Sequence, residues 1–199
     1  MPKLLESIGD YMEKHIQVTK IPELIAGFTS YRTYGIGSFD IKYVRAIVQP
    51  NGSSFTYSSN IQREVKKITK RLNDDVDKSK AIFDWIISNI KYEKRKTSCY
   101  KGALQTYIDK NGVCGESAAL QVTMERLAGN IAFLTEIEKG AIGTTSTGRI
   151  VNITELHACT AHVKPNGEIL LIDTTIPEGF GIKYDLFKIV SDEHSFASY

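Results

Sequence analysis

The chain has 199 residues, of which 42% are hydrophobic and 24% are charged, and its formal net charge is +2. This composition is typical of a globular protein with one ordinary core, and it excludes a disordered chain. The small net charge gives no reason to expect a nucleic acid or an anionic membrane as a partner. No apolar stretch approaches the length of a bilayer span.

The three cysteines are an odd number, which argues against a disulfide framework. The first residues lack the basic flank and apolar run of a secretory signal, so we expect none. A cytoplasmic location is therefore predicted, where a reactive thiol stays free. The sequence contains no feature that predicts an oligomeric state.

Residues 1–57 are predicted to form an N-terminal extension, followed by a single domain over residues 58–199. Apolar positions over residues 3–15 have helical spacing. Residues 28–57 contain aromatic and β-branched residues interrupted by glycines and by Pro50-Asn51-Gly52, which predicts two or three strands with turns. Their purpose is not predicted.

Two helices are expected next. Ser59 or Asn60 is a candidate N-cap for a helix that runs to about Leu72. Its basic residues favour a solvated face over a site for an acidic partner; they are Arg63, Lys66, Lys67, Lys70 and Arg71. Asp77 is a candidate N-cap for a helix over residues 78–90, ending before Tyr92. One face of this helix is predicted to enter the core, and it carries Ile82, Trp85, Ile86 and Ile90.

A basic loop follows, and a short helix over residues 103–108 then leads to Asn111-Gly112. The loop could favour substrates with carboxylates, or it could be a solvated loop without a role. Its relevant residues are Lys91, Lys94, Arg95, Lys96 and Cys99; we expect Cys99 to be incidental.

Cys114 directly follows Gly112-Val113 and begins a predicted helix that runs to about Leu127 and ends at Gly129-Asn130. A helix N-terminus has free N–H groups and partial positive charge, which favour a thiolate and can bind an oxyanion. The alternative is a small buried core residue. We favour the nucleophile, because a histidine and an aspartate with suitable spacing follow.

A β-hairpin is predicted to bring these two residues together. A strand over residues 131–137 and a polar turn over 140–148 come first, and two strands then flank the turn 164–168. His157 begins the first strand of the hairpin and Asp173 ends the second, so antiparallel pairing would bring them close. A carboxylate there would fix the imidazole tautomer, although Asp173 could also be an ordinary turn residue.

These motifs together resemble the transglutaminase-like superfamily of papain-like cysteine enzymes. The matching segments are Gly112-Val113-Cys114, His157-Ala158 and Leu171-Ile172-Asp173-Thr174-Thr175, with the upstream helix from Ala81 to Tyr92. The resemblance covers about residues 60–180. Cys159 replaces the family's aromatic residue after His-Ala, and Thr174 replaces its proline.

The resemblance implies an α+β fold in which a helical part carries the cysteine and packs on an antiparallel sheet carrying His157 and Asp173. It implies that Cys114 attacks a peptide or amide carbonyl of a protein or peptide-like substrate, and that the resulting thioester is hydrolysed. The alternatives are an amine acceptor, as in a protein-glutamine transglutaminase, and a non-catalytic binding domain that retains the fold.

The second oxyanion donor is open. Gln105 and Tyr92 are the main candidates, and Tyr100 and Tyr107 are rivals. We expect His162 to be exposed or half-buried and Cys159 to pack near the site. A zinc site from His157, Cys159 and His162 is disfavoured, because strand alternation would point one of them away. No calcium-binding loop is visible, and no metal or cofactor is expected.

Overall fold

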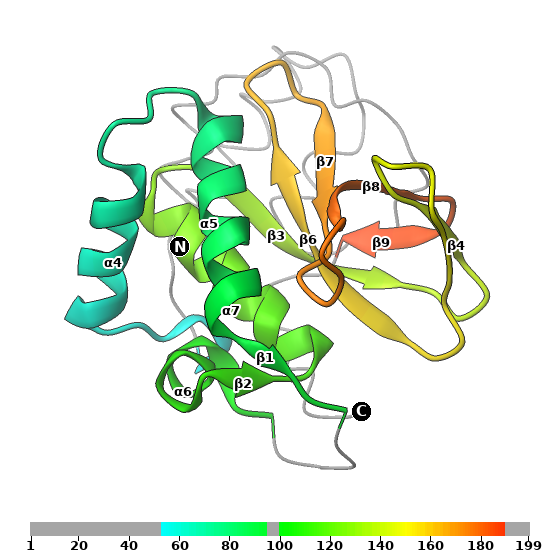
Figure 1. Cartoon of the computed structure of the whole chain (residues 1–199), viewed down its shortest axis with the longest axis horizontal. Coiled ribbons are helices and arrows are strands. Elements are labelled where there is room, and N and C mark those ends of the chain that lie inside the picture. Colours follow the sequence, from blue (N-terminus) through cyan, green and yellow to red (C-terminus); the bar gives the residue numbers. More distant parts are fainter. Residues whose placement is uncertain (1–52, 95–99, 190–199) are drawn as a thin grey trace, which may run out of the picture.

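The computed structural model describes residues 53–94 and 100–189 (Figure 1). The predicted helix over residues 3–15 and most of the predicted strands over 28–57 lie outside these residues. Ser53–Phe55 forms a short 3-10 helix, η1, where the last of these strands was predicted. The division at residue 57 stays a prediction.

The described part is an α+β structure, which confirms the predicted fold class. Its helices are α4 (Ser59–Thr69), α5 (Asp75–Asn89), α6 (Gly102–Asp109) and α7 (Cys114–Leu127). Two short segments, β1 (Lys91–Tyr92) and β2 (Asn111–Gly112), pair in parallel beside α6.

A sheet of seven strands forms the second layer, and all its neighbouring strands are antiparallel. The strand order is β5-β4-β8-β7-β6-β3-β9. In chain order the strands are β3 (Ile131–Ile137), β4 (Ile142–Thr144), β5 (Ile150–Asn152), β6 (His157–Val163), β7 (Ile169–Ile172), β8 (Phe180–Tyr184) and β9 (Phe187–Ile189).

Helix α7 lies between the other helices and the sheet, and it contacts β3 and β6 as well as α4, α5 and α6 (Figure 1). Every residue from Gly115 to Arg126 is buried. A surface helix would need only one apolar stripe, whereas α7 is enclosed on all sides. Its first residue, Cys114, therefore sits at a fixed position on a rigid core element.

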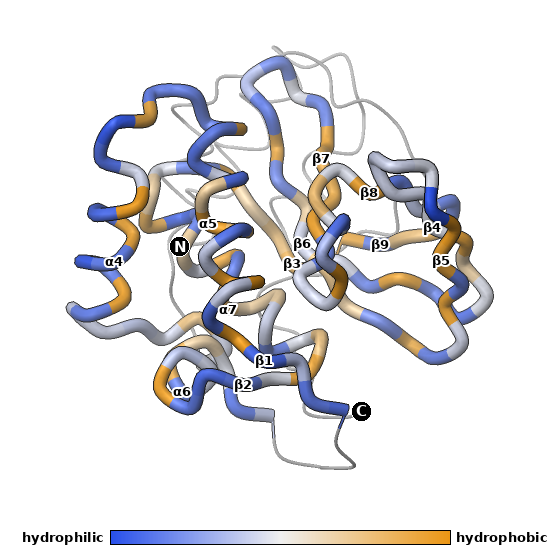
Figure 2. Tube along the Cα trace, viewed as in Figure 1, coloured by the Kyte–Doolittle hydropathy of each residue, from blue (hydrophilic) through white to orange (hydrophobic). Residues whose placement is uncertain are grey.

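The predicted basic helix, α4, buries Ile61 and Val65 and alternates hydrophilic with hydrophobic positions (Figure 2). The helix ends at Thr69 and not at about Leu72, so it contains Arg63, Lys66 and Lys67, while Lys70 and Arg71 follow it; all five are exposed. This agrees with a solvated face, because charged side chains are rarely buried without partners. Among the described residues, no helix combines the length and the apolar character needed to cross a bilayer.

The ends of several elements differ from the sequence prediction. The cap of α4 is Ser58, whose hydroxyl accepts from the N–H of Ile61 at 3.5 Å. The cap of α5 is Asp74 and not Asp77, since the Asp74 carboxylate accepts from the N–H groups of Val76 and Asp77. The predicted polar turn over residues 140–148 contains strand β4. Candidate caps three residues apart have equal propensity, so packing of the helix decides between them.

Candidate active site

Cys114 is held at the N-terminus of α7 by the backbone that precedes it. Val113 is extended (φ −82°, ψ 175°), and its N–H donates to the Glu116 carboxylate at 3.0 Å. The same carboxylate accepts from the N–H of Lys101 at 2.9 Å, which ties the start of α6 to the start of α7. A Cβ at Gly112 would lie only 3.2 Å from the Glu116 Cβ. A glycine at this position therefore lets the backbone of residue 112 pass close to the Glu116 side chain.

The predicted hairpin is formed by β6 and β7, with Thr160 opposite Ile172. It brings His157, the first residue of β6, next to Asp173, which directly follows β7. The Nε2 atom of His157 lies 2.8 Å from Oδ2 of Asp173. The imidazole is partly accessible, whereas the carboxylate is only 1% exposed. A buried carboxylate in this place orients the ring and favours its protonated form.

Cys114 and His157 act on each other's pKa through a side-chain hydrogen bond and through their charges. Burial alone would raise the pKa of the Cys114 thiol, but His157 and the N–H groups of Ala158 and Gly115 outweigh burial and lower it. Burial alone would lower the pKa of His157, but its hydrogen bonds to Asp173 and Cys114 raise it to about 10. The pair therefore favours the thiolate and imidazolium forms more than the isolated side chains would.

The Asp173 carboxylate has a full set of donors. The Tyr184 hydroxyl donates to Oδ2 at 2.6 Å, and Thr175 donates to Oδ1 through its N–H at 2.9 Å and its hydroxyl at 2.6 Å. Burial would raise the pKa of Asp173, but His157, Thr175 and Tyr184 lower it. Neither Thr175 nor Tyr184 was assigned a role from the sequence. The Asp-x-Thr spacing is a signal for a local turn, whereas no sequence signal identifies Tyr184.

The turn after Asp173 depends on a glycine. The N–H of Asp173 donates to the carbonyl of Gly179 at 2.9 Å. A Cβ at Gly179 would lie only 1.9 Å from the carbonyl oxygen of Asp173. Any side chain there would force the carboxylate-bearing segment to move.

The two main oxyanion candidates have different surroundings. Tyr92 is 44% exposed and lies in β1 beside Gly112, two residues before Cys114. Partial burial and the charges of Cys114 and Asp173 raise its pKa, which places its hydroxyl near the site as a protonated donor. Gln105 is exposed, and its amide donates to Asp109 within α6 at 2.6 Å. This contact directs Gln105 into solvent, which weakens it as a candidate.

The rival tyrosines have other contacts. The Tyr100 hydroxyl donates to the carbonyl of Gly115 at 3.0 Å, in the first turn of α7. Tyr107 stacks on Trp85, with ring centroids 5.6 Å apart. Trp85 is half-buried and packs against the apolar cluster between α5 and α7, in agreement with its prediction as a core residue.

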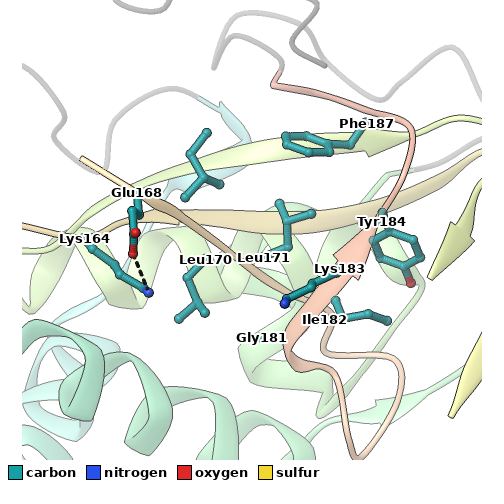
Figure 3. A pocket seen from close by; sticks show the side chains of 10 residues that line it. Lys164, Glu168, Leu170, Leu171, Gly181, Ile182, Lys183, Tyr184 and Phe187 are labelled. Carbon is teal, nitrogen blue, oxygen red and sulfur yellow. Dashed lines mark hydrogen bonds and ion pairs between the residues drawn. The ribbon is translucent and has the colours of Figure 1, made fainter. Parts of the chain in front are cut away.

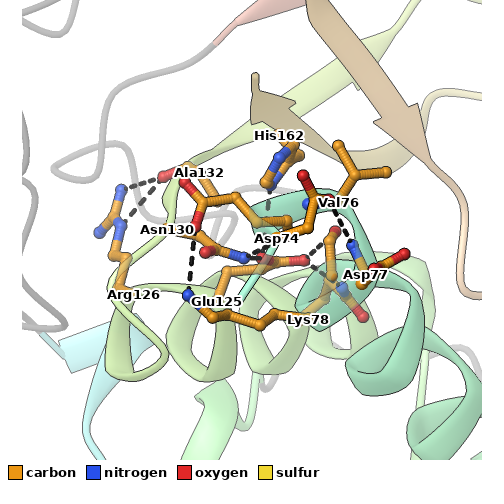
Figure 4. Close-up of polar contacts among 12 residues, drawn as sticks. Asp74, Val76, Asp77, Lys78, Glu125, Arg126, Asn130, Ala132 and His162 are labelled. Carbon is orange, nitrogen blue, oxygen red and sulfur yellow. Dashed lines mark hydrogen bonds and ion pairs between the residues drawn. The ribbon is translucent and has the colours of Figure 1, made fainter. Parts of the chain in front are cut away.

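The second histidine of β6 differs from its prediction, because His162 is fully buried and not exposed or half-buried. Its Nδ1 atom lies 3.4 Å from Oε2 of Glu125, in a polar cluster between α5, α7 and the sheet (Figure 4). Strand alternation points His162 and His157 to opposite faces of the sheet. The face that carries His162 is covered by α7 and is not exposed to solvent. The sequence pattern alone does not show which faces are covered.

Cys159 is buried in the apolar cluster of the sheet, and burial raises the pKa of its thiol. It therefore packs near the site as a protonated side chain. Cys99, Arg95 and Lys96 lie outside the described residues. Within residues 53–94 and 100–189, no group of three or more histidine, cysteine or acidic side chains is arranged to hold a metal ion.

Two further features lie around the site. Lys94, from the basic loop, forms an exposed ion pair with Glu155 at 3.3 Å, which links the helical side to the loop before β6.

A pocket of about 540 Å³ lies over strands β7, β8 and β9, and Tyr184 is among its lining residues (Figure 3). Cys114, His157 and Asp173 do not line this pocket.

Comparison with known proteins gives a family and a fold. Residues 62–160 match a family model described as the transglutaminase-like superfamily, a range that contains Cys114 and His157. None of the curated proteins compared with the sequence matches it.

Two solved structures have a similar fold. One is a protein from Cytophaga hutchinsonii, provisionally assigned as a cysteine protease, with 21% identity, a TM-score of 0.53, and coverage of 75% of this chain and 47% of its own. The other is the periplasmic domain of TgpA from Pseudomonas aeruginosa, with 14% identity, a TM-score of 0.50, and coverage of 69% and 48%. These identities show a shared fold. The chain spans about half the length of the structures it matches.

Proposed function

We propose that this chain, which belongs to the transglutaminase-like superfamily, is a cysteine-dependent acyl-transfer enzyme that hydrolyses a peptide or amide bond. The observation that supports this most directly is the chain of contacts from Cys114 to His157 to Asp173. A thiolate at a helix N-terminus, a histidine beside it and a carboxylate behind the histidine are the parts that nucleophilic catalysis requires.

In the first step, the Cys114 thiolate attacks the carbonyl carbon of the substrate, and the carbonyl oxygen becomes an oxyanion. Backbone N–H groups at the start of α7 are available to stabilise this charge. Tyr92 is the second donor we favour, because its exposed hydroxyl lies near Cys114 and its raised pKa keeps it protonated. Gln105 is the less suitable candidate, given its contact with Asp109.

In the second step, the tetrahedral intermediate collapses and the bond from carbon to the leaving nitrogen breaks. His157 gives its proton to the leaving amine, and Asp173 holds the ring in position for this transfer. The product that stays on the enzyme is a thioester at Cys114. Water then attacks the thioester while His157 takes the proton from the water, and the free acid leaves with the thiolate restored.

The reactivity of Cys114 is the property that tests this proposal first. Alkylation by iodoacetamide should be fast at pH 6 to 7, well below the range where an ordinary thiol ionises near pH 8.5. In His157→Ala the rate at neutral pH should fall, and its midpoint should move towards the ordinary value. The modified residue is identified by peptide mass mapping, since Cys99 and Cys159 are also present.

If the alkylation rate of Cys114 in the wild type has the pH dependence of an ordinary thiol, this result would contradict the proposed enzyme activity. It would favour a binding domain that retains the fold. Where the thiol is reactive, peptide and amide substrates are compared with Cys114→Ala as the matched inactive control. Addition of a fluorescent primary amine separates the two acyl acceptors: release of the acid alone supports hydrolysis, whereas a stable amine adduct supports a transglutaminase.

A further inference from the structure

Two donors share one oxygen of the Asp173 carboxylate. Oδ2 accepts from the Tyr184 hydroxyl at 2.6 Å and contacts Nε2 of His157 at 2.8 Å. We propose that Tyr184 is a positioning residue that, through Asp173, fixes the orientation of His157 and limits its affinity for the proton. This inference rests on the proposed function, in which His157 must release a proton to the leaving amine.

The fold places Tyr184 at this oxygen through two neighbouring strands. Tyr184 ends β8, and the turn from β7 to β8 is closed by the hydrogen bond from the Asp173 N–H to the Gly179 carbonyl. On the other side of β8, Gly143 of β4 lies opposite Tyr184. A Cβ at Gly143 would come within 2.5 Å of the tyrosine ring, so a glycine leaves the space that the ring occupies.

The surroundings keep Tyr184 a permanent donor. The residue is 2% exposed. Burial and the charge of Asp173 raise the pKa of its hydroxyl, so it stays protonated at any pH at which the protein folds. Asp173 stays ionised in turn, because its pKa is lowered by its donors. The hydrogen bond between them therefore has the same direction throughout the reaction.

A hydroxyl on Oδ2 changes how strongly this oxygen attracts the imidazole proton. A hydrogen bond to a carboxylate stabilises its charge, so less of that charge is available to a second partner on the same oxygen. His157 already holds its proton firmly, with a pKa of about 10. Loss of the Tyr184 hydroxyl should raise this pKa further, which makes His157 a weaker acid for the leaving group.

Thr175 provides a comparison on the same carboxylate. Its hydroxyl also donates to Asp173, at 2.6 Å, but to Oδ1, which His157 does not share. Its N–H donates to the same atom, so Thr175→Val leaves one donor in place. Tyr184→Phe and Thr175→Val each remove one hydroxyl from Asp173 and keep nearly the same side-chain shape. Only Tyr184→Phe should act strongly on His157.

The experiment follows the titration of the His157 ring by ¹⁵N NMR with labelled histidine, and His157→Ala assigns the signal among the four histidines. It uses the Cys114→Ala protein, because removal of the thiol withdraws its hydrogen bond and charge from His157 and brings the midpoint to lower pH. Tyr184→Phe in this background should raise the midpoint by about 0.5 to 1 pH unit, as expected for one lost charge-assisted hydrogen bond on a shared oxygen. Thr175→Val should give a clearly smaller shift.

Gly143→Ala is a second variant that displaces the ring without removal of the hydroxyl. It should shift the His157 midpoint in the same direction, and its combination with Tyr184→Phe should add little, because both changes break one contact. An unchanged midpoint in folded Tyr184→Phe would overturn the proposal. An equal shift in Thr175→Val would also overturn it, since the number of donors and not the shared oxygen would then matter.

This titration requires no substrate and no turnover, so its outcome is independent of the test of the proposed function. If Cys114 shows an ordinary alkylation profile but the His157 midpoint shifts in Tyr184→Phe, the proposed enzyme activity is rejected and the role of the Tyr184–Asp173 hydrogen bond is supported. A reactive Cys114 with an unshifted midpoint would keep the enzyme and reject the role of Tyr184.

Discussion

Replacement of Glu125 by alanine should strongly destabilise the protein. Glu125 is fully buried near the C-terminal end of α7, where its carboxylate accepts hydrogen bonds from Ser79, Gln121 and Asn130 (Figure 4). The His162 ring lies 3.4 Å away. One carboxylate thus connects α5, α7, the start of β3 and β6. Its removal would take the acceptor from Ser79 and Gln121 and leave the Asn130 amide with only the Asp75 carbonyl.

The size of the effect follows from these contacts. Each buried donor left unpaired costs about 1 to 3 kcal/mol. The costs do not add fully, because the amides can rotate and water can enter the space of the lost side chain. We therefore expect a loss of about 3 to 5 kcal/mol, the range measured when one partner of a buried polar network is removed. For a chain of this size, that corresponds to a fall in Tm of about 6 to 20 °C.

The measurement is urea unfolding at neutral pH, followed by circular dichroism. Glu168→Ala is the matched control, since Glu168 is an exposed carboxylate paired with Lys164 at 3.1 Å, and its loss should leave the midpoint unchanged. A loss below about 1 kcal/mol in Glu125→Ala would refute the reasoning, because it would mean that the cluster relaxes or is hydrated. In folded Glu125→Ala, iodoacetamide should still alkylate Cys114 at the wild-type rate, because the cluster lies about 16 Å along α7 from the thiol.

Three further predictions concern the site. First, the stability that the raised pKa of His157 contributes should be fully present below about pH 6.5 and be lost as the pH rises through about 10, since the folded histidine keeps its proton to about 10 and the unfolded one loses it around 6.5; the lowered pKa of Cys114 adds stability as the pH rises towards 9.0, and urea titrations of His157→Ala should lack the His157 component. Second, Gly179→Ala should slow Cys114 alkylation at neutral pH and lower the Tm, because its Cβ would clash with the Asp173 carbonyl, and a wild-type rate would contradict this. Third, Lys94→Glu should leave the Tm nearly unchanged, because the ion pair of Lys94 with Glu155 is exposed, but it should raise KM for acidic peptides at low salt and much less at high salt; an unchanged KM at low salt would contradict a role of this charge.

The sequence predicted the contact between His157 and Asp173 better than it predicted the residues that support Asp173. Cys114, His157 and Asp173 are each fixed by local signals: a helix start, a strand start and a strand end. The approach of His157 to Asp173 follows from hairpin pairing, which the turn at residues 164–168 specifies, whereas the approach of Cys114 depends on how α7 packs on β6. Tyr184 could not be predicted in this way, because its contact with Asp173 depends on the register of β8 and on space at Gly143.

The buried cluster of Glu125 and His162 shows a second limit. Alternation along β6 correctly indicates that His157 and His162 point to opposite faces, but it does not show what covers each face. The sequence of α7 also has no single apolar stripe, because this helix is buried on all sides and its polar residues bond to one another. A prediction that assumes one solvent-exposed face therefore assigned exposure to His162, which is buried.

Helix α7 and strand β6 carry the proposed nucleophile and base at one end and a buried polar pair at the other. Cys114 begins the helix and His157 begins the strand, while Glu125 and His162 meet near the far end of the same contact. Nucleophilic catalysis requires reacting groups held to within about 0.5 Å, and such precision comes from rigid elements with well-supported side chains. The polar cluster stabilises the packing of the helix on the strand about 16 Å from the thiol, so its loss should lower the stability of the protein while the local contacts of Cys114 and His157 keep their geometry. We hypothesise that Glu125 and His162 specify one arrangement of the helix on the strand, where leucines at both positions would tolerate several; wild-type NMR line widths in the double leucine variant would contradict this.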